Sequence, residues 1–450
     1  MIKQIIYTQL TKDTCIIFFI MSNKSVNHII CPVYGQIPIS AHAQYIITHS
    51  KFQRLQYIKQ TGLAYLIFKD SIHTRYDHSI GVYYLTRLTL QHIKRLYPDR
   101  KYDLPELCSG LSSDTKFELN ERIMTIIEIA ALCHDIGHGP YSHLFDFVLL
   151  SDKSHPNFRH EVRSCLIVEI ICKDWLSQRE LNFLKSIIDP KPHNIGPLYQ
   201  IVCNNFNGID VDKLDYIYRD SHHMHRFRTF NPFTIIQSMR IFNNNIVYSL
   251  ESLSDIQNIF TSRFDLHKNY YNNSQVKCVE QMWIDHVLEI NNQIDSISDI
   301  EKFCLLVDND FYFDGIFLKK DYFVVSDTIV RSNSSDAIFA KMKDFVSLMS
   351  NEIISNQLRS VDFPIDSNRL FEIVFLEYGY SNTLKNPLKN VLLHKICTEN
   401  GKSVEQQFDL EDIFKLPFTE KRFILILKSP KHKYDTLMKL NRHNMSKSNL

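Results

Sequence analysis

The sequence has no hydrophobic run near its start that is long enough to cross a membrane. The apolar stretch at residues 15–21 covers only seven positions, whereas a transmembrane helix needs roughly 20 apolar residues. No A-x-A-like cleavage site follows this stretch, so a signal peptide is not favoured. We expect residues 1–26 to form an N-terminal extension that the fold does not need, and we expect no membrane partner.

Cysteine pairs and net charge are also lacking. The ten cysteines are scattered, with no CxxC pair. This pattern indicates reduced thiols in an intracellular protein, cytoplasmic or nuclear, and argues against a disulfide framework or a zinc ribbon. Fifty-one Lys and Arg offset fifty Asp and Glu, leaving a formal charge of +1. Because no global field would attract an anion, an anionic substrate must be held by a local cluster of charge.

Glycine and proline are sparse, with 11 and 14 in 450 residues, while 44% of the residues are hydrophobic. This composition is typical of a folded chain. Apolar residues at spacings of three and four predict helices over 77–96, 121–134 and 208–220, and shorter runs predict strands at 321–325 and 423–427. We therefore predict a mainly α fold, with a helical domain at 27–295, a smaller mixed α+β C-terminal lobe at 296–433 and a basic tail at 434–450.

Adjacent His134 and Asp135 are the first candidates for chemistry. An imidazole and a carboxylate at one helix end can enter the coordination sphere of one metal, but the dipeptide alone is common and carries little weight. Other sequence blocks strengthen the interpretation of this pair as metal ligands. The pair extends as HDIGHGPYSHLFD over 134–146, and three further blocks are HTRYDH at 73–78, RHE at 159–161 and DVDK at 210–213.

These four blocks together resemble the HD-domain superfamily of phosphohydrolases. The resemblance implies a helical core and a metal site of two histidines and two carboxylates, which here are His78, His134, Asp135 and Asp212. Mixed nitrogen and oxygen ligands suit Mg, Mn, Fe, Ni or Zn, so a divalent metal ion is expected and its identity is left open. The alternative, that these are ordinary core or surface residues, is disfavoured by the joint match.

Longer segments carry a more specific resemblance. FQRLQYIKQTGLAY, HTRYDHSIGVYYL, IAALCHDIGHGPYSHLFD and NGIDVDKLDYIYRDSHH resemble the deoxynucleoside triphosphate triphosphohydrolase family, which includes animal SAM-and-HD-domain enzymes and bacterial dGTPases. The match runs from about residue 27 to about residue 393, and no SAM domain is expected before it. It implies an enzyme that releases the whole triphosphate from a dNTP. We also expect a homo-oligomer, either a dimer or a tetramer.

The resemblance also implies roles for residues around the metal site. His143 corresponds to the acid that protonates the departing sugar 5′-oxygen, and Asp146 to the carboxylate that orients it. Histidine is suited to this task because its pKa lies near neutrality. Contacts to the phosphates are implied for His138, His160, Arg75 and Lys213.

Sugar recognition is implied for a second group of residues. Gln60 and Asp220 correspond to partners of the 3′-hydroxyl, and Tyr216 and Tyr271 to a wall that excludes a 2′-hydroxyl. Such a wall rejects ribonucleotides because the extra hydroxyl finds neither room nor a partner. Arg263 and His267 match the segment along the sugar and phosphate path. Taken singly, a tyrosine is more often a packing residue.

Departures from the family lead to a prediction about regulation. Where the animal enzyme binds an activating guanine nucleotide with charged side chains, this chain has Asn27, Ile30, Thr48 and Gln56, and later Asn273 and Ser274. We therefore expect hydrolysis without GTP-triggered activation. Two alternatives stay open, namely another HD nucleotidase or phosphodiesterase, and an inactive HD protein that binds nucleic acid weakly through its basic tail.

Overall fold

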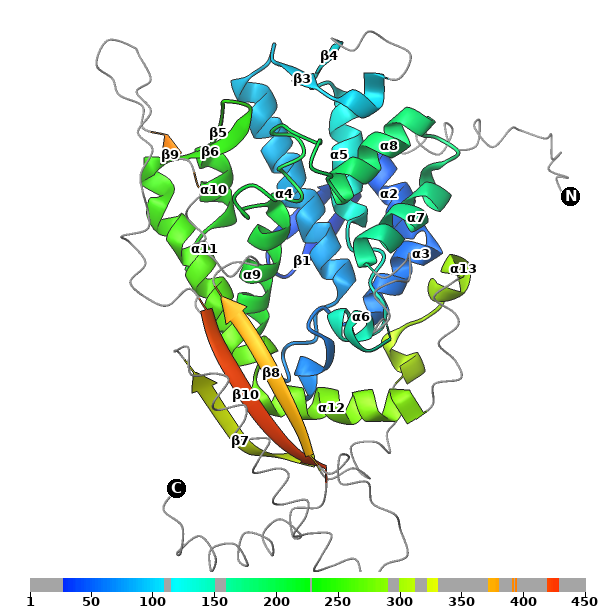
Figure 1. Cartoon of the computed structure of the whole chain (residues 1–450). Helices are drawn as coiled ribbons and strands as arrows, with labels where there is room; N and C mark the ends of the chain where they lie inside the picture. The colour runs from blue at the N-terminus through cyan, green and yellow to red at the C-terminus, as the bar shows by residue number, and fades with distance from the viewer. Residues whose placement is uncertain are drawn as a thin grey trace, which may run out of the picture.

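The computed structural model describes residues 27–108, 115–149, 159–226, 229–289, 299–311, 322–330, 371–379, 391, 393–394 and 419–428. Helices dominate this part of the chain and the sheets are small (Figure 1), so the predicted mainly α fold is confirmed. The expected N-terminal extension and the basic tail lie outside the described residues.

Three helices form the centre of the molecule and carry the predicted motifs. They are α4 (Arg75–Leu96), α5 (Glu121–Cys133) and α9 (Val211–His223). Side chains cap each one at its first turn: Thr74 forms a capping box with Asp77, Asn120 accepts from the amide of Ile123, and Asp210 accepts from the amide of Lys213. These caps satisfy amides that have no partner within the helix, and so fix where each helix begins.

Further helices surround this centre, and α4 packs against both α5 and α9. The surrounding helices are α2 (Ala41–Thr48), α3 (Ser50–Gln53), α6 (His143–Leu149), α7 (His160–Cys172), α8 (Gln178–Ile188), α10 (Pro232–Ser238), α11 (Leu253–Leu266), α12 (Ser274–Glu289) and α13 (Ile300–Phe303). Short 3₁₀ or π turns are η1 (Arg54–Tyr57), η2 (Gly62–Leu66), η3 (Pro105–Cys108), η4 (Leu250–Ser252), η5 (His267–Tyr271) and η7 (Asp308–Phe311). One continuous apolar core joins most of these elements.

The strands of the described residues form small sheets, most of which lie at the edges of the helical body (Figure 1). Two are antiparallel pairs, β1 (Asn27–Cys31) with β2 (Gly35–Ile39) and β3 (Lys101–Asp103) with β4 (Lys116–Glu118). In the third, β6 (Asn245–Ser249) lies between antiparallel β5 (Met239–Phe242) and parallel β9 (Leu393–His394). The fourth places β10 (Thr419–Lys428) between β7 (Tyr322–Val330) and β8 (Phe371–Gly379), all antiparallel. The strands predicted at 321–325 and 423–427 are therefore confirmed.

Residues 299–311, which the predicted division assigns to the C-terminal lobe, pack against the helical body. Phe303 is fully buried in the main core, and the guanidinium of Arg54 donates to the carbonyl oxygen of Leu306 at 3.0 Å. The division at 295/296 stays a prediction, but this segment is physically part of the surroundings of the site.

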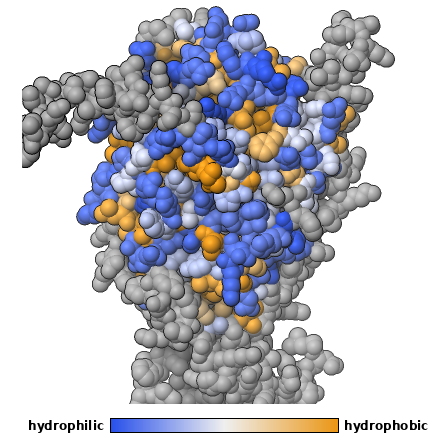
Figure 2. Space-filling model, turned by 180° about the vertical axis from the view of Figure 1, so that it is seen from behind, coloured by the Kyte–Doolittle hydropathy of each residue, from blue (hydrophilic) through white to orange (hydrophobic). Residues whose placement is uncertain are grey.

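The described surface is mostly polar. On the face drawn in Figure 2, hydrophilic residues predominate and hydrophobic residues form small separate patches. Among the described residues no helix combines the length and the apolar character that a membrane span requires.

Candidate functional site

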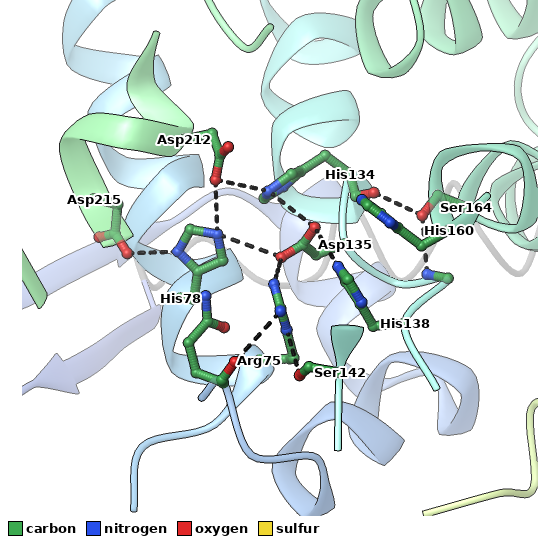
Figure 3. A network of polar contacts seen from close by, with 12 residues as sticks. Arg75, His78, His134, Asp135, His138, Ser142, His160, Ser164, Asp212 and Asp215 are labelled. Atoms are coloured by element: carbon green, nitrogen blue, oxygen red, sulfur yellow. Dashed lines mark hydrogen bonds and ion pairs between the residues drawn. The ribbon is translucent and has the colours of Figure 1, made fainter. Parts of the chain in front are cut away.

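Two histidines from different helices face each other at the centre of the molecule. His78 lies in the first turn of α4, and His134 follows the last residue of α5. One nitrogen of each ring is engaged, because His78 Nδ1 lies 2.8 Å from Asp215 Oδ2 and His134 Nδ1 lies 2.8 Å from the carbonyl oxygen of Ala131. Both Nε2 atoms are buried and point into the same space (Figure 3).

Two carboxylates complete this group. Asp212 Oδ1 lies 3.1 Å from His78 Nε2 and 3.5 Å from His134 Nε2. The two oxygens of Asp135 lie 3.4 Å from the same two nitrogens. An ion about 2.0–2.2 Å from each of its ligand atoms sets neighbouring ligand atoms about 3–3.5 Å apart. The four residues that the resemblance implies as ligands therefore fit a divalent metal ion.

The charges around these residues also suit a cation. Asp135 pairs with Arg75, and Asp215 pairs with Arg219, whereas the contacts of Asp212 go to the two histidines. Burial opposes protonation of His78, but its contacts with Asp212 and Asp215 outweigh burial and raise the pKa of this imidazole to about 10. The three carboxylates thus exceed the two guanidinium groups by one negative charge. In the free protein a proton on His78 offsets this charge, and a metal ion would offset it when bound.

A second group of histidines lies beside the first. One ligand atom from each of His138, His143, Asp146 and His160 lies within 4.8 Å of the others. The rings of His138 and His160 stack with centroids 3.9 Å apart, and the His143 ring meets His138 edge-on at 4.8 Å. Burial and the nearby Arg75 lower the pKa of His138, and they lower the pKa of His143 to about 4. Both imidazoles are therefore neutral in the free protein at pH 7.

Asp146, which the resemblance implies as the carboxylate that orients His143, contacts two other residues. Its carboxylate pairs with Arg163 and lies 3.5 Å from His160 Nδ1. Both partners are on α7, which packs beside the segment that carries Asp146. Asp146 can thus act on His143 through its charge, which raises the pKa of that imidazole against the effect of burial.

The two expected phosphate-binding cations are also engaged within the protein. Arg75 donates to Asp135 and to Ser142 Oγ, and Lys213 Nζ lies 2.9 Å from Asp210 Oδ2. In the free protein both cations thus have partners within the chain, and their contact with phosphate stays a prediction. These contacts follow from the position of the cations inside the protein, because a cation removed from water needs a nearby anion or hydrogen-bond acceptor. Both still line the cavity and contribute positive charge to it.

A cavity of about 700 Å³ opens beside both groups of histidines. Its volume falls within the range of roughly 300–1,000 Å³ that is typical of small-molecule sites. Every residue expected to contact the sugar or its path lines this cavity, and these are Gln60, Tyr216, Asp220, Arg263, His267 and Tyr271. Four of the expected catalytic and metal-binding histidines line it as well, namely His134, His138, His143 and His160.

Asp220 already has two partners inside the protein. Its oxygens lie 2.6 Å from His73 Nε2 and 2.5 Å from the Tyr271 hydroxyl, which donates to it. The Oε1 of Gln60, by contrast, is buried and has no hydrogen-bond partner. Gln60 is therefore the better placed of the two to accept a new hydrogen bond.

Sequence reasoning did not predict a role in this site for two residues that position it, Asp215 and Ser164. Asp215 holds His78, and Ser164 joins the end of α5 to the following loop by donating to the carbonyl oxygen of His134 and accepting from the amide of Gly137. Asp215 could have been found, because it lies three residues after Asp212 and so on the same side of α9. Nothing in the local sequence marks Ser164.

Comparison with known proteins agrees with this geometry. A family model described as HD domain matches residues 75–191, the stretch that includes His78, His134 and Asp135. Residues 75–191 of this chain are therefore similar to an HD domain.

Three relatives narrow the resemblance. An HD-domain-containing protein of Acanthamoeba polyphaga mimivirus is 47% identical over 293 residues, covering 63% of this chain and 62% of the relative. The deoxynucleoside triphosphate triphosphohydrolase SAMHD1 homolog of Dictyostelium discoideum is 30% identical over 64% of this chain and 54% of the relative. The SAMHD1 enzyme of Homo sapiens is 26% identical over 80% of this chain and 64% of its own length.

The resemblance to the deoxynucleoside triphosphate triphosphohydrolase family is thus confirmed. The matched stretch spans less than two thirds of the length of each of these three relatives.

Proposed function

We propose that this protein hydrolyses deoxynucleoside triphosphates to the deoxynucleoside and inorganic triphosphate. The observation that carries the proposal is the convergence of His78, His134, Asp135 and Asp212 at one edge of a cavity that also contains the second histidine group. Two named triphosphohydrolases among the relatives support the choice of substrate. A divalent ion held by these four residues would supply an activated water and neutralise charge on the phosphate oxygens.

His143 acts as the proton donor to the 5′-oxygen in this proposal. A sugar alkoxide is a poor leaving group, and a histidine can donate a proton only when it is an imidazolium. Its pKa of about 4 in the free protein reflects burial and the charges of Arg75 and His160. A bound triphosphate with about four negative charges would counter that effect and raise the pKa, since opposite charges within a few ångströms favour the charged form.

The 3′-hydroxyl of the sugar is recognised by Gln60 in the same proposal. The buried, unpartnered Oε1 of Gln60 can accept a hydrogen bond from it, and Asp220 is held in place by His73 and Tyr271. Tyr216 and Tyr271 line the cavity beside them and support exclusion of a ribose.

Product analysis tests the proposal. The purified protein is incubated with each of the four dNTPs and Mg or Mn, and the products are separated by chromatography, with Asp135→Ala as the inactive control. Release of triphosphate together with deoxynucleoside is expected. Monophosphate or pyrophosphate products would instead support a different HD phosphohydrolase, and no product with any metal would support a non-catalytic protein.

We also propose that hydrolysis needs no guanine nucleotide. Asn27, Ile30, Thr48 and Gln56 offer no charge at the N-terminal block, and Ser274 begins α12 without one. Turnover of a single dNTP other than dGTP is expected to be equal with and without GTP. A strict requirement for GTP would refute this part of the proposal.

A further inference from the structure

Asp308 is a buried carboxylate that holds two segments of the cavity wall together. It begins the short helix η7, its side chain and backbone are 6% exposed, and it lies far along the chain from the residues that it contacts. Its Oδ1 accepts a hydrogen bond from the amide of Tyr141 at 2.6 Å, and its Oδ2 accepts one from the amide of Lys59 at 2.8 Å.

Both amides belong to segments that carry residues of the proposed mechanism. Tyr141 lies two residues before His143, the proposed proton donor, and Lys59 directly precedes Gln60, the proposed partner of the 3′-hydroxyl. One carboxylate thus bridges the segment that would meet the 5′-oxygen and the segment that would meet the 3′-oxygen of the same sugar.

The loop on the His143 side needs such support because its backbone is strained. Tyr141 and Ser142 have φ angles of 55° and 60°, in the left-handed region that side chains other than glycine rarely adopt. Ser142 reinforces the bridge, since its hydroxyl donates to the carbonyl oxygen of Lys59 at 2.6 Å. The loop is therefore joined to the backbone of Lys59 twice, from Tyr141 through Asp308 and from Ser142 directly.

The ionised carboxylate suits this role better than an amide would. Each oxygen accepts one N–H donor, whereas an asparagine has only one acceptor oxygen and would direct its NH₂ group at the second amide. Burial raises the pKa of Asp308 to about 6 despite these two hydrogen bonds, so the carboxyl group is kept ionised at neutral pH against the effect of its surroundings.

We propose that Asp308 is a positioning residue, which fixes His143 and Gln60 relative to each other so that one bound sugar meets both. This inference rests on the proposed function and extends it to the segment at 299–311. Misplacing a catalytic group by about 1 Å can lower a rate roughly a hundredfold, so a change at Asp308 acts on kcat although Asp308 does not touch the substrate.

Three variants of the full chain test the role of Asp308. Asp308→Asn removes one acceptor, and Asp308→Glu keeps both acceptors on a longer side chain. Asp310→Asn is the matched control, because Asp310 is exposed on the same segment and accepts from the amide of Val307, which lies only three residues away. The measurements are kcat and KM for dNTP hydrolysis, bound metal per chain, and hydrogen exchange of the peptide that contains the Tyr141 amide.

For Asp308→Asn we expect a loss in kcat of about tenfold or more, less than threefold change in KM, unchanged bound metal and faster exchange at Tyr141. The kcat of Asp308→Glu should be higher than that of the Asn variant. The kcat of Asp310→Asn should stay within twofold of the wild-type value. A folded, metal-loaded Asn variant with kcat within twofold of the wild type would overturn the inference. If the Asn variant does not fold, the Glu variant decides: wild-type kcat together with faster exchange at the Tyr141 amide would overturn the inference, because the bridge would then be lost without an effect on turnover.

The two proposals can fail separately. Triphosphate release by the unmodified protein tests the proposed function. Exchange at the Tyr141 amide reports on the bridge itself, even if the reaction proves to be a different one, and unchanged exchange in the folded Asp308→Asn variant would show that no bridge exists.

Discussion

Gly81→Ala should destabilise the protein, although an alanine normally stabilises a helix. Gly81 lies within α4, one turn after His78. A Cβ atom placed there would lie 1.9 Å from Asp215 Oδ1 and 2.2 Å from Arg219 Nη2, whereas real contacts of this kind are longer than 3.0 Å. The substitution must therefore separate α4 from α9 or displace the Asp215–Arg219 ion pair.

The size of the effect follows from two opposing terms. Replacing glycine by alanine inside a helix contributes about 1 kcal/mol of stability. Asp215 and Arg219 are completely buried, and disrupting a buried ion pair costs about 3–5 kcal/mol. The net loss is about 2–4 kcal/mol, which for a helical domain of about 270 residues lowers the unfolding temperature by about 4–7 °C. Because Asp215 also holds His78, metal binding should weaken as well.

Thermal unfolding followed by helical circular dichroism, together with the metal content of the purified protein, provides the assay. Gln91→Ala is the control, because Gln91 is exposed on the same helix and surface changes usually stay within about 0.5 kcal/mol. If Gly81→Ala unfolds at or above the wild-type temperature and binds metal normally, the close packing of α4 on α9 is refuted.

Three further predictions concern the site. Asp215→Asn should weaken metal binding about 10–100-fold, measured by competition with a chelating dye, because His78 Nδ1 loses its anionic partner; unchanged affinity would contradict the positioning of His78. The pH profile of kcat/KM reports the free protein, in which the pKa of His143 is about 4, whereas kcat reports the complex. Its proton is lost as pH rises, so the loss of kcat should begin at a higher pH than the loss of kcat/KM; coincident profiles would argue against His143 as the acid. Tyr271→Phe removes a donor to Asp220, so kcat/KM for a dNTP should fall about tenfold, and discrimination against the ribonucleotide should narrow in a competition assay; an unchanged ratio would remove Tyr271 from sugar selection.

Local sequence patterns predicted the helices that carry the site because those patterns are themselves local. The three-and-four spacing at 121–134 gave α5, and the segment after Gly208 gave α9 with Asp212 in its first turn. The resemblance then brought His78, His134, Asp135 and Asp212 together in one group, and the structure has them within reach of a common ion. Their roles as ligands stay a prediction.

The sequence predicted which side chains gather at the site better than it predicted their hydrogen-bond and ion-pair partners. The resemblance associated Asp146 with His143, yet its oxygens go to Arg163 and His160. Arg75, which the resemblance implies as a phosphate contact, donates to Asp135 and Ser142 in the free protein. In both cases burial determines the result, because a buried charged group must find a partner within the protein before any ligand is present. A spacing pattern contains no information about burial.

The loop at 136–142 explains why so many charged residues are buried around this site. Loops usually lie on the surface, because their backbone amides and carbonyls lack regular partners. Here Arg54 donates to the carbonyl oxygens of Ile136 and His138, Arg163 donates to that of Gly137, and Asp308 accepts from the amide of Tyr141. Each of these charged side chains replaces water as the partner of a buried backbone group. Burying the loop places His138 and, directly after the loop, His143 in the cavity wall, so the buried charges from distant segments are a physical requirement of that placement.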